Sequence, residues 1–140
     1  MHTSESSESA VVTASLAPQG LAVDVSTEAD FFLRADEPEE NGGQNTGPDP
    51  FAYLFTALAS CILITIRMYA SRKSWPLDGA TIQIFPVEHA GFVVKRIEYT
   101  LELVGKLSDE QRSRIRQVAH QCPVHKTLVG GVEIAERIEK

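Results

Sequence analysis

The pattern of hydrophobic and polar positions predicts strands and helices along the whole chain. Short runs rich in Val, Leu and Ala, and runs that alternate apolar with polar side chains, are typical of strands. The predicted strands are residues 10–16, 21–26, 30–35, 80–88, 92–104 and 132–138. Ser108 opens a capping-box pattern for a helix to about residue 121, and Pro123 begins a short helical segment that Gly130-Gly131 ends.

The longest apolar segment is a predicted helix over 51–73, whose first turns are apolar on every face. Asp49 and Arg67 bracket an uncharged run that is shorter than the about 20 residues a bilayer span needs. We therefore expect a buried helix of a soluble protein, with no membrane partner. A helix that is apolar all round is buried in a core or against another subunit. Because 140 residues can hardly surround it, the pattern is compatible with an obligate homodimer.

Length and charge narrow the classes of function. A chain of 140 residues, 43% of them hydrophobic, suits one domain, which we place over 10–140 behind a disordered acidic tail at 1–9. The net charge of −6 disfavours binding to a nucleic-acid backbone, so no nucleic-acid partner is expected. The polar N-terminus lacks the basic and apolar regions of a secretory signal, which predicts a cytoplasmic protein. Residues 36–50 are rich in Gly, Pro, Asp and Asn and predict a loop, whose acidic residues 36–40 we interpret as solvated.

Two cysteines are the candidates for chemistry. Cys61 lies within the apolar helix, where burial alone would raise its pKa and leave it an inert core residue. Cys122 precedes Pro123 at the predicted start of the short helix, where backbone N–H groups and the nearby His125 favour a thiolate. On the residues alone, Cys122 is therefore the better candidate for a reactive thiol, although a chance Cys-Pro with a nearby His fits equally well.

Both cysteines fall on apolar stripes that must meet in one small core. A thiolate there could attack a peroxide and become a sulfenic acid, which the second thiol would convert to a disulfide. Zinc is a weaker interpretation, since Cys61, Cys122 and His125 would need a fourth ligand such as His120. Patterns for a serine nucleophile or a nucleotide-binding loop are missing from the sequence.

Three segments of the chain read ADEPEENGGQNTGPDPF, LFTALASCILITIRMYASRKSWPLDG and LSDEQRSRIRQVAHQCPVHKTL. They resemble the OsmC/Ohr family, and its general OsmC-like branch in particular, and the likeness covers about residues 30–130. The resemblance implies an α+β fold in which two antiparallel sheets wrap around long central helices of an intertwined homodimer. It also implies reduction of organic hydroperoxides, with Cys61 as the peroxide-attacking cysteine and Cys122 as the resolving one. No cofactor is implied, and the reductant would be a dithiol such as a protein-bound lipoyl group.

The sequence departs from the family's pattern at two places. Peroxidase members carry a Glu at the start of the cysteine helix, where Phe51 and Ala52 stand here. They also carry an Arg near the turn after the first strand, and residues 17–20 contain none. That Arg pairs with the Glu and holds the thiolate, so its absence predicts a higher pKa and a slower reaction at Cys61. Arg34 and Arg67 are the candidate substitutes.

The leading hypothesis is a homodimeric, thiol-dependent peroxidase for organic hydroperoxides. Apolar residues predicted around Cys61 would favour an apolar peroxide, namely Phe51, Leu54, Phe55 and Leu58. The alternative is a family member with weak or no peroxidase activity that binds a small molecule or senses redox state. A purely structural cysteine pair in an unrelated α+β dimer is a third interpretation, which cysteines too far apart for a bridge would support.

Overall fold

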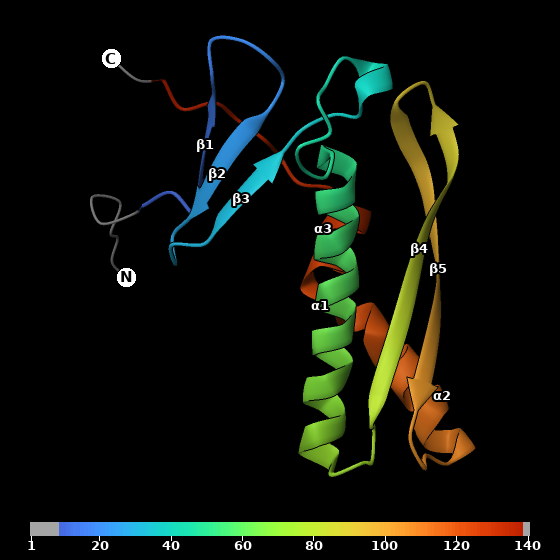
Figure 1. Cartoon of the computed structure of the whole chain (residues 1–140). Coiled ribbons are helices and arrows are strands. Elements are labelled where there is room, and N and C mark those ends of the chain that lie inside the picture. The colour runs from blue at the N-terminus through green and yellow to red at the C-terminus, as the bar shows by residue number, and fades with distance from the viewer. Residues whose placement is uncertain (1–8, 139–140) are drawn as a thin grey trace. The chain divides into compact units, whose positions relative to one another are not determined.

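The computed structural model describes residues 9–138 of the chain (Figure 1). The predicted tail at 1–9 lies outside the described residues except for its last residue. The chain divides into two compact units, Met1–Leu54 and Phe55–Lys140, which are described separately below. The single domain expected over 10–140 stays a prediction.

The first unit contains a small antiparallel sheet. Its strands are β1 (Val12–Leu16), β2 (Val23–Thr27) and β3 (Phe32–Ala35), in the order β1-β2-β3. All three strands lie where the sequence predicts them. Ala14 pairs with Val25, and Val25 pairs with Leu33 on its other side. Apolar residues of this sheet remain exposed within the unit, Phe32 among them.

The loop after β3 is organised by one carboxylate. Asp36 is only 3% exposed and accepts hydrogen bonds from the backbone N–H groups of Glu37, Gln44 and Thr46 and from the Thr46 hydroxyl. The Thr46 hydroxyl and N–H and the Glu37 N–H lower the pKa of Asp36 to about 2. The loop also contains a short 3-10 helix, η2 (Glu39–Asn41). The interpretation of 36–40 as wholly solvated is therefore wrong at Asp36, because this residue closes the loop onto itself.

The second unit packs a hairpin and helices around one core. Helix α1 (Pro50–Lys73) begins in the first unit and continues along the hairpin of β4 (Gly79–Ala90) and β5 (Val93–Val104) (Figure 1). The helices α2 (Asp109–Val118), η3 (Ala119–Gln121) and α3 (Pro123–Gly130) follow. Ser108 caps α2 in the predicted capping box: its side chain accepts from the Gln111 N–H, and its own N–H donates to the Gln111 side chain. The fold is α+β with two antiparallel sheets, as predicted.

The core of the second unit covers one side of α1. Leu58, Ile62, Ile66 and Ala70 follow an i, i+4 spacing and are buried with Leu101, Leu103, Leu107 and Ile115. The opposite side of the helix remains open within the chain, with Ile64 57% and Met68 59% exposed. By length and composition alone α1 could cross a membrane, and 17% of its most apolar window is buried in this chain. The expected burial on every face is therefore not achieved by residues 9–138 alone.

One predicted element is absent. Residues 132–138 form no strand, and Ile134 is 88% exposed. A strand needs a neighbour for its backbone hydrogen bonds, and no described strand pairs with this segment. The alternation of apolar side chains there was therefore misleading.

Candidate functional site

The structure brings the two cysteines together in the second unit. Cys61 lies midway along α1 and is half-buried against the core. Cys122 precedes α3 and is 0% exposed. Their thiols form a hydrogen bond with each other, and both cysteines are free. This contact counts against a structural pair too far apart for a bridge, and it confirms that the two apolar stripes meet.

Cys122 occupies the position expected from the sequence but has the opposite electrostatics. It is the N-cap of α3, and its sulfur accepts a hydrogen bond from the His125 backbone N–H at 3.3 Å. Burial raises the pKa of the Cys122 thiol, and the neighbouring Cys61 thiol raises it further. The N–H groups of His125 and Val124 act in the other direction but are weaker. The expectation that Cys122 is the more acidic thiol is therefore wrong.

Cys61 is the thiol whose ionised form the surroundings favour. Burial raises its pKa, but hydrogen bonds from the Cys122 thiol, the Val124 backbone N–H and the Thr65 hydroxyl outweigh that effect. The pKa of Cys61 consequently lies below its usual value. These donors would stabilise a Cys61 thiolate beside a protonated Cys122, which is the arrangement that disulfide chemistry requires of an attacking and a resolving sulfur.

The donors to Cys61 were not found from the sequence. Thr65 follows Cys61 by four residues, and residues at this spacing are neighbours on a helix. This contact could therefore have been predicted from the sequence. The Val124 N–H lies in the first turn of α3, where backbone N–H groups have no partner within the helix. Its contact with Cys61 depends on how α3 packs against α1, which no local pattern predicts.

Neither candidate arginine contributes to the Cys61 pKa. Arg34 pairs with Asp24, with an Nε–Oδ1 distance of 2.8 Å. Arg67 donates from Nη1 to the carbonyl oxygen of Leu77 at 2.7 Å. Among the described residues, hydrogen-bond donors rather than a cation therefore lower the pKa of Cys61.

The histidines beside Cys122 form a ring pair. The His120 and His125 rings lie 5.4 Å apart with an interplanar angle of 36°. Within residues 9–138, no cluster of three or more His, Cys, Asp or Glu side chains could hold a metal ion. The zinc interpretation thus lacks a ligand set in this part of the chain.

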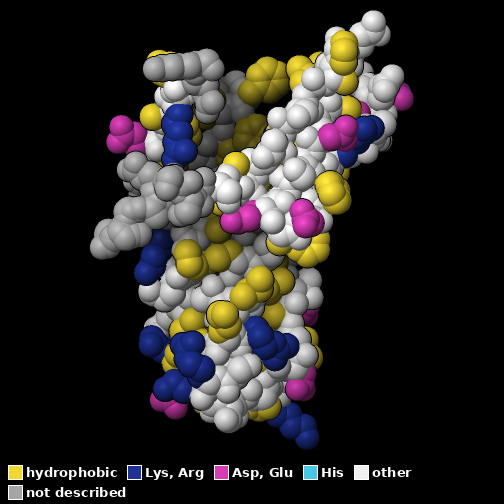
Figure 2. All heavy atoms as spheres, turned by 90° about the vertical axis from the view of Figure 1, so that its left-hand side faces the viewer, with side chains coloured by type: hydrophobic (Ala, Val, Ile, Leu, Met, Phe, Trp, Pro, Cys, Tyr) yellow, Lys and Arg dark blue, Asp and Glu magenta, His cyan; other side chains and the backbone are white. Residues whose placement is uncertain are grey.

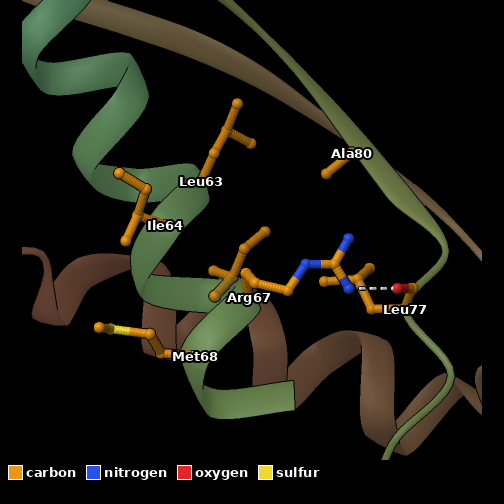
Figure 3. A pocket seen from close by; sticks show the side chains of 7 residues that line it. Leu63, Ile64, Arg67, Met68, Leu77 and Ala80 are labelled. Carbon is orange, nitrogen blue, oxygen red and sulfur yellow. Dashed lines mark hydrogen bonds between the residues drawn. The ribbon is translucent and has the colours of Figure 1, made fainter. Parts of the chain in front are cut away.

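A pocket of about 250 Å³ lies between α1 and the start of β4 (Figure 3). Its walls are apolar except for Arg67, and the lining residues are Leu63, Ile64, Ile66, Arg67, Met68, Leu77 and Ala80. Cys61 does not line it. Leu58, one of the apolar residues expected around Cys61, is buried in the core against which Cys61 packs.

Comparisons with known proteins agree with the architecture. The family model described as OsmC-like protein matches residues 43–137. A search of curated proteins finds no match.

Several solved structures share the fold. An OsmC-like protein from Mycoplasma pneumoniae is 22% identical with a TM-score of 0.72, and the alignment covers 89% of each chain. A Psychrobacter arcticus protein named for osmotic stress and detoxification is 21% identical with a TM-score of 0.74, over 86% of this chain and 88% of the other. The organic hydroperoxide resistance protein OhrB of Bacillus subtilis is 23% identical with a TM-score of 0.59, over 87% of this chain and 91% of the other. At these identities the likeness shows the fold.

Proposed function

The chain belongs to the OsmC-like protein family, and on that premise we propose that it is a two-cysteine peroxidase for organic hydroperoxides. The observation that carries the proposal is the hydrogen-bonded pair of free thiols in which Cys61 has the lowered pKa and Cys122 the raised one. The name of the structurally similar Bacillus subtilis protein, organic hydroperoxide resistance protein, supports the same class of substrate.

The proposed reaction has two steps at sulfur. The Cys61 thiolate attacks the terminal oxygen of the peroxide, the O–O bond breaks, and the alkoxide leaves and takes up a proton as the alcohol. Cys61 is then a sulfenic acid. The Cys122 thiol attacks that sulfur, a disulfide forms, and water leaves. The contact between the two thiols supports this second step, because the resolving sulfur already lies beside the attacking one.

A dithiol completes the proposed cycle. Its first thiolate attacks the Cys61–Cys122 disulfide, and its second thiol closes its own ring, which returns both protein thiols. A lipoyl group carried on a protein is a dithiol of this kind. We place the reaction in the cytoplasm, a reducing compartment in which a dithiol could keep both cysteines reduced between turnovers.

The proposed assembly is a homodimer that covers the open side of α1. Ile64 and Met68 lie on that side, three and seven residues after Cys61. A soluble monomer rarely exposes a long apolar helix face. In the dimer, Cys61 would therefore lie at the edge of the interface, where a second chain could exclude water from an apolar peroxide.

The decisive experiment counts free thiols after reduced protein is mixed with cumene hydroperoxide. We expect two thiols per chain to disappear and a dithiol to restore them. Cys61→Ser should abolish peroxide consumption, whereas Cys122→Ser should still consume one equivalent and accumulate a sulfenic acid that dimedone labels. Unchanged peroxide consumption in Cys61→Ser would overturn the proposal.

The alternative function is a small-molecule-binding or redox-sensing module. It is favoured by one observation, namely that no arginine contributes to the Cys61 pKa in the described residues. Such a module would form the same disulfide, but slowly and without turnover by a dithiol. In this case each chain would lose its two thiols once, and excess dithiol would not lead to further peroxide consumption. That result would indicate the alternative.

A further inference from the structure

Three cations surround one aromatic ring at the C-terminal end of α1. The Lys73 Nζ lies 5.7 Å and the Arg72 Cζ 5.9 Å from the centre of the Tyr69 ring. Arg114, from α2, places its Cζ 5.6 Å from the same centre and donates from Nε to the Tyr69 hydroxyl at 3.2 Å. Figure 2 shows Lys and Arg side chains gathered over the lower end of the second unit.

These cations have no acidic partner among the described residues. The ion pairs found there are Arg34–Asp24 and Arg96–Glu98, which lie elsewhere. The other hydrogen bond of Arg114 goes from Nη1 to the neutral Gln117 side chain. Positive charge is thus concentrated here although the net charge of the chain is −6. The cations repel one another, so a bound anion would stabilise the cluster.

From this geometry we propose that Tyr69, Arg72, Lys73 and Arg114 form a binding site for a phosphate-type oxyanion. The guanidinium groups of Arg72 and Arg114 come from two different helices and can each donate two parallel hydrogen bonds to adjacent oxygens. Lys73 adds a point charge, and the phenol of Tyr69 adds one donor when Arg114 turns toward the ligand.

The pKa of the phenol reflects the same positive surroundings. The hydrogen bond from Arg114 lowers the pKa of Tyr69, and the charges of Arg114, Lys73 and Arg72 lower it further. Every charge that acts on this phenol is therefore positive. A bound oxyanion would neutralise that field, and the pKa of Tyr69 would rise toward its usual value.

The site is distinct from the thiol pair. Tyr69 follows Cys61 by eight residues along α1, which corresponds to about 12 Å of helical rise. Neither sulfur contributes to the Tyr69 pKa, and the proposal does not depend on the peroxidase activity. The ligand could be free phosphate or a phosphate monoester, because both present the same oxygens.

The only tryptophan of the chain provides the measurement. Trp75 packs edge-on against Tyr69, with ring centres 5.5 Å apart and an interplanar angle of 78°. We would titrate the full-length protein with inorganic phosphate, glycerol phosphate and succinate at constant ionic strength set by chloride, and follow Trp75 fluorescence. Both phosphate compounds should give saturable changes. A higher affinity for glycerol phosphate than for inorganic phosphate would identify a monoester as the preferred source.

Matched variants decide whether the response comes from the cluster. Arg114→Gln should weaken phosphate binding about tenfold, since it removes a charge-assisted hydrogen bond. Arg116→Gln removes the same charge from the same helix but two residues away, on a different face, and should bind as the wild type does. Circular dichroism would verify that both variants are folded, and the absorbance of the phenolate should show the Tyr69 pKa rising when phosphate binds.

Three results would overturn the proposal. The first is a fluorescence response to phosphate no greater than that to chloride. The second is equal weakening in Arg114→Gln and Arg116→Gln, which would indicate general charge attraction. The third is saturable binding of succinate without binding of either phosphate compound.

Discussion

The two sides of α1 carry similar apolar side chains in different surroundings. Leu58, Ile62 and Ile66 are buried under the β4–β5 hairpin and α2, whereas Ile64 and Met68 are more than half exposed. The side chains themselves do not differ enough to explain this contrast, so what differs is the presence of a covering element. Cys61 lies between the two sides, three residues after Leu58 and three before Ile64. Cys61 is therefore covered on the core side of α1 and open on the other side, which the proposed dimer would cover.

The largest expected effect is on the buried side. Ile66→Ala should lower the free energy of unfolding by about 2–5 kcal/mol, because Ile66 is fully buried and the truncated side chain leaves a cavity. Thermal and urea denaturation would measure the loss, which should be the same at low and high protein concentration. Ile64→Ala is the matched control on the exposed side. An equal loss in both variants at every concentration would show that the two sides do not differ.

A charge on the exposed side should act on assembly instead. Met68→Lys should convert the proposed dimer to monomer, because covering a Met side chain contributes about 1.5–3 kcal/mol and an unpaired charge in an apolar interface is unfavourable. Sedimentation velocity would measure the oligomeric state. Val104→Lys places the same charge on β5, at an apolar residue that is also exposed, and should remain dimeric. A Met68→Lys variant that stays dimeric would show that this side of α1 is not the interface.

Local patterns predicted most of the elements but not what covers them. The capping box at Ser108, the turn residues and the alternation in β5 act within a few residues, so the helix and strand positions followed from the sequence. The segment 132–138 has the same alternation but no strand beside it, and pairing is not a local property. Asp36 looked like one of several loop acids, although its four hydrogen bonds come from residues up to ten positions away.

The candidate site shows the same limit. The sequence correctly placed Cys122 at the start of α3 and predicted that its stripe would meet that of Cys61. It ranked the two pKa values in the wrong order, because burial of Cys122 and the donors that reach Cys61 both arise from packing between helices. The family resemblance assigned the attacking role to Cys61, and the directions of the two pKa shifts support that assignment.

A smaller effect is expected from the cap of α2, one of the elements that cover the buried side. Ser108→Ala should lower the free energy of unfolding by about 1 kcal/mol, because the Gln111 N–H loses its side-chain acceptor. Ser113→Ala, at an exposed position within the same helix, should be neutral or slightly stabilising. Urea denaturation of both variants would test this difference. Equal free energies of unfolding in the two variants would show that the capping box does not stabilise α2 against the buried side of α1.

The smallest change concerns the pH at which Cys61 reacts, with little effect on stability. Alkylation by iodoacetamide proceeds through the thiolate, so its rate rises with pH through the thiol pKa. Because the pKa of Cys61 is lowered, the pH at which its alkylation rate is half-maximal should be lower than for a free cysteine, and Cys122 should react more slowly.

Thr65→Val keeps the shape of the side chain but removes one donor, so the pH midpoint of Cys61 alkylation should move to higher pH. Ser60→Ala removes a hydroxyl that donates to the Thr56 carbonyl instead, and should leave the midpoint unchanged. If Thr65→Val also leaves it unchanged, the Val124 N–H and the Cys122 thiol stabilise the thiolate without Thr65, and Cys122→Ala should then move the midpoint to higher pH.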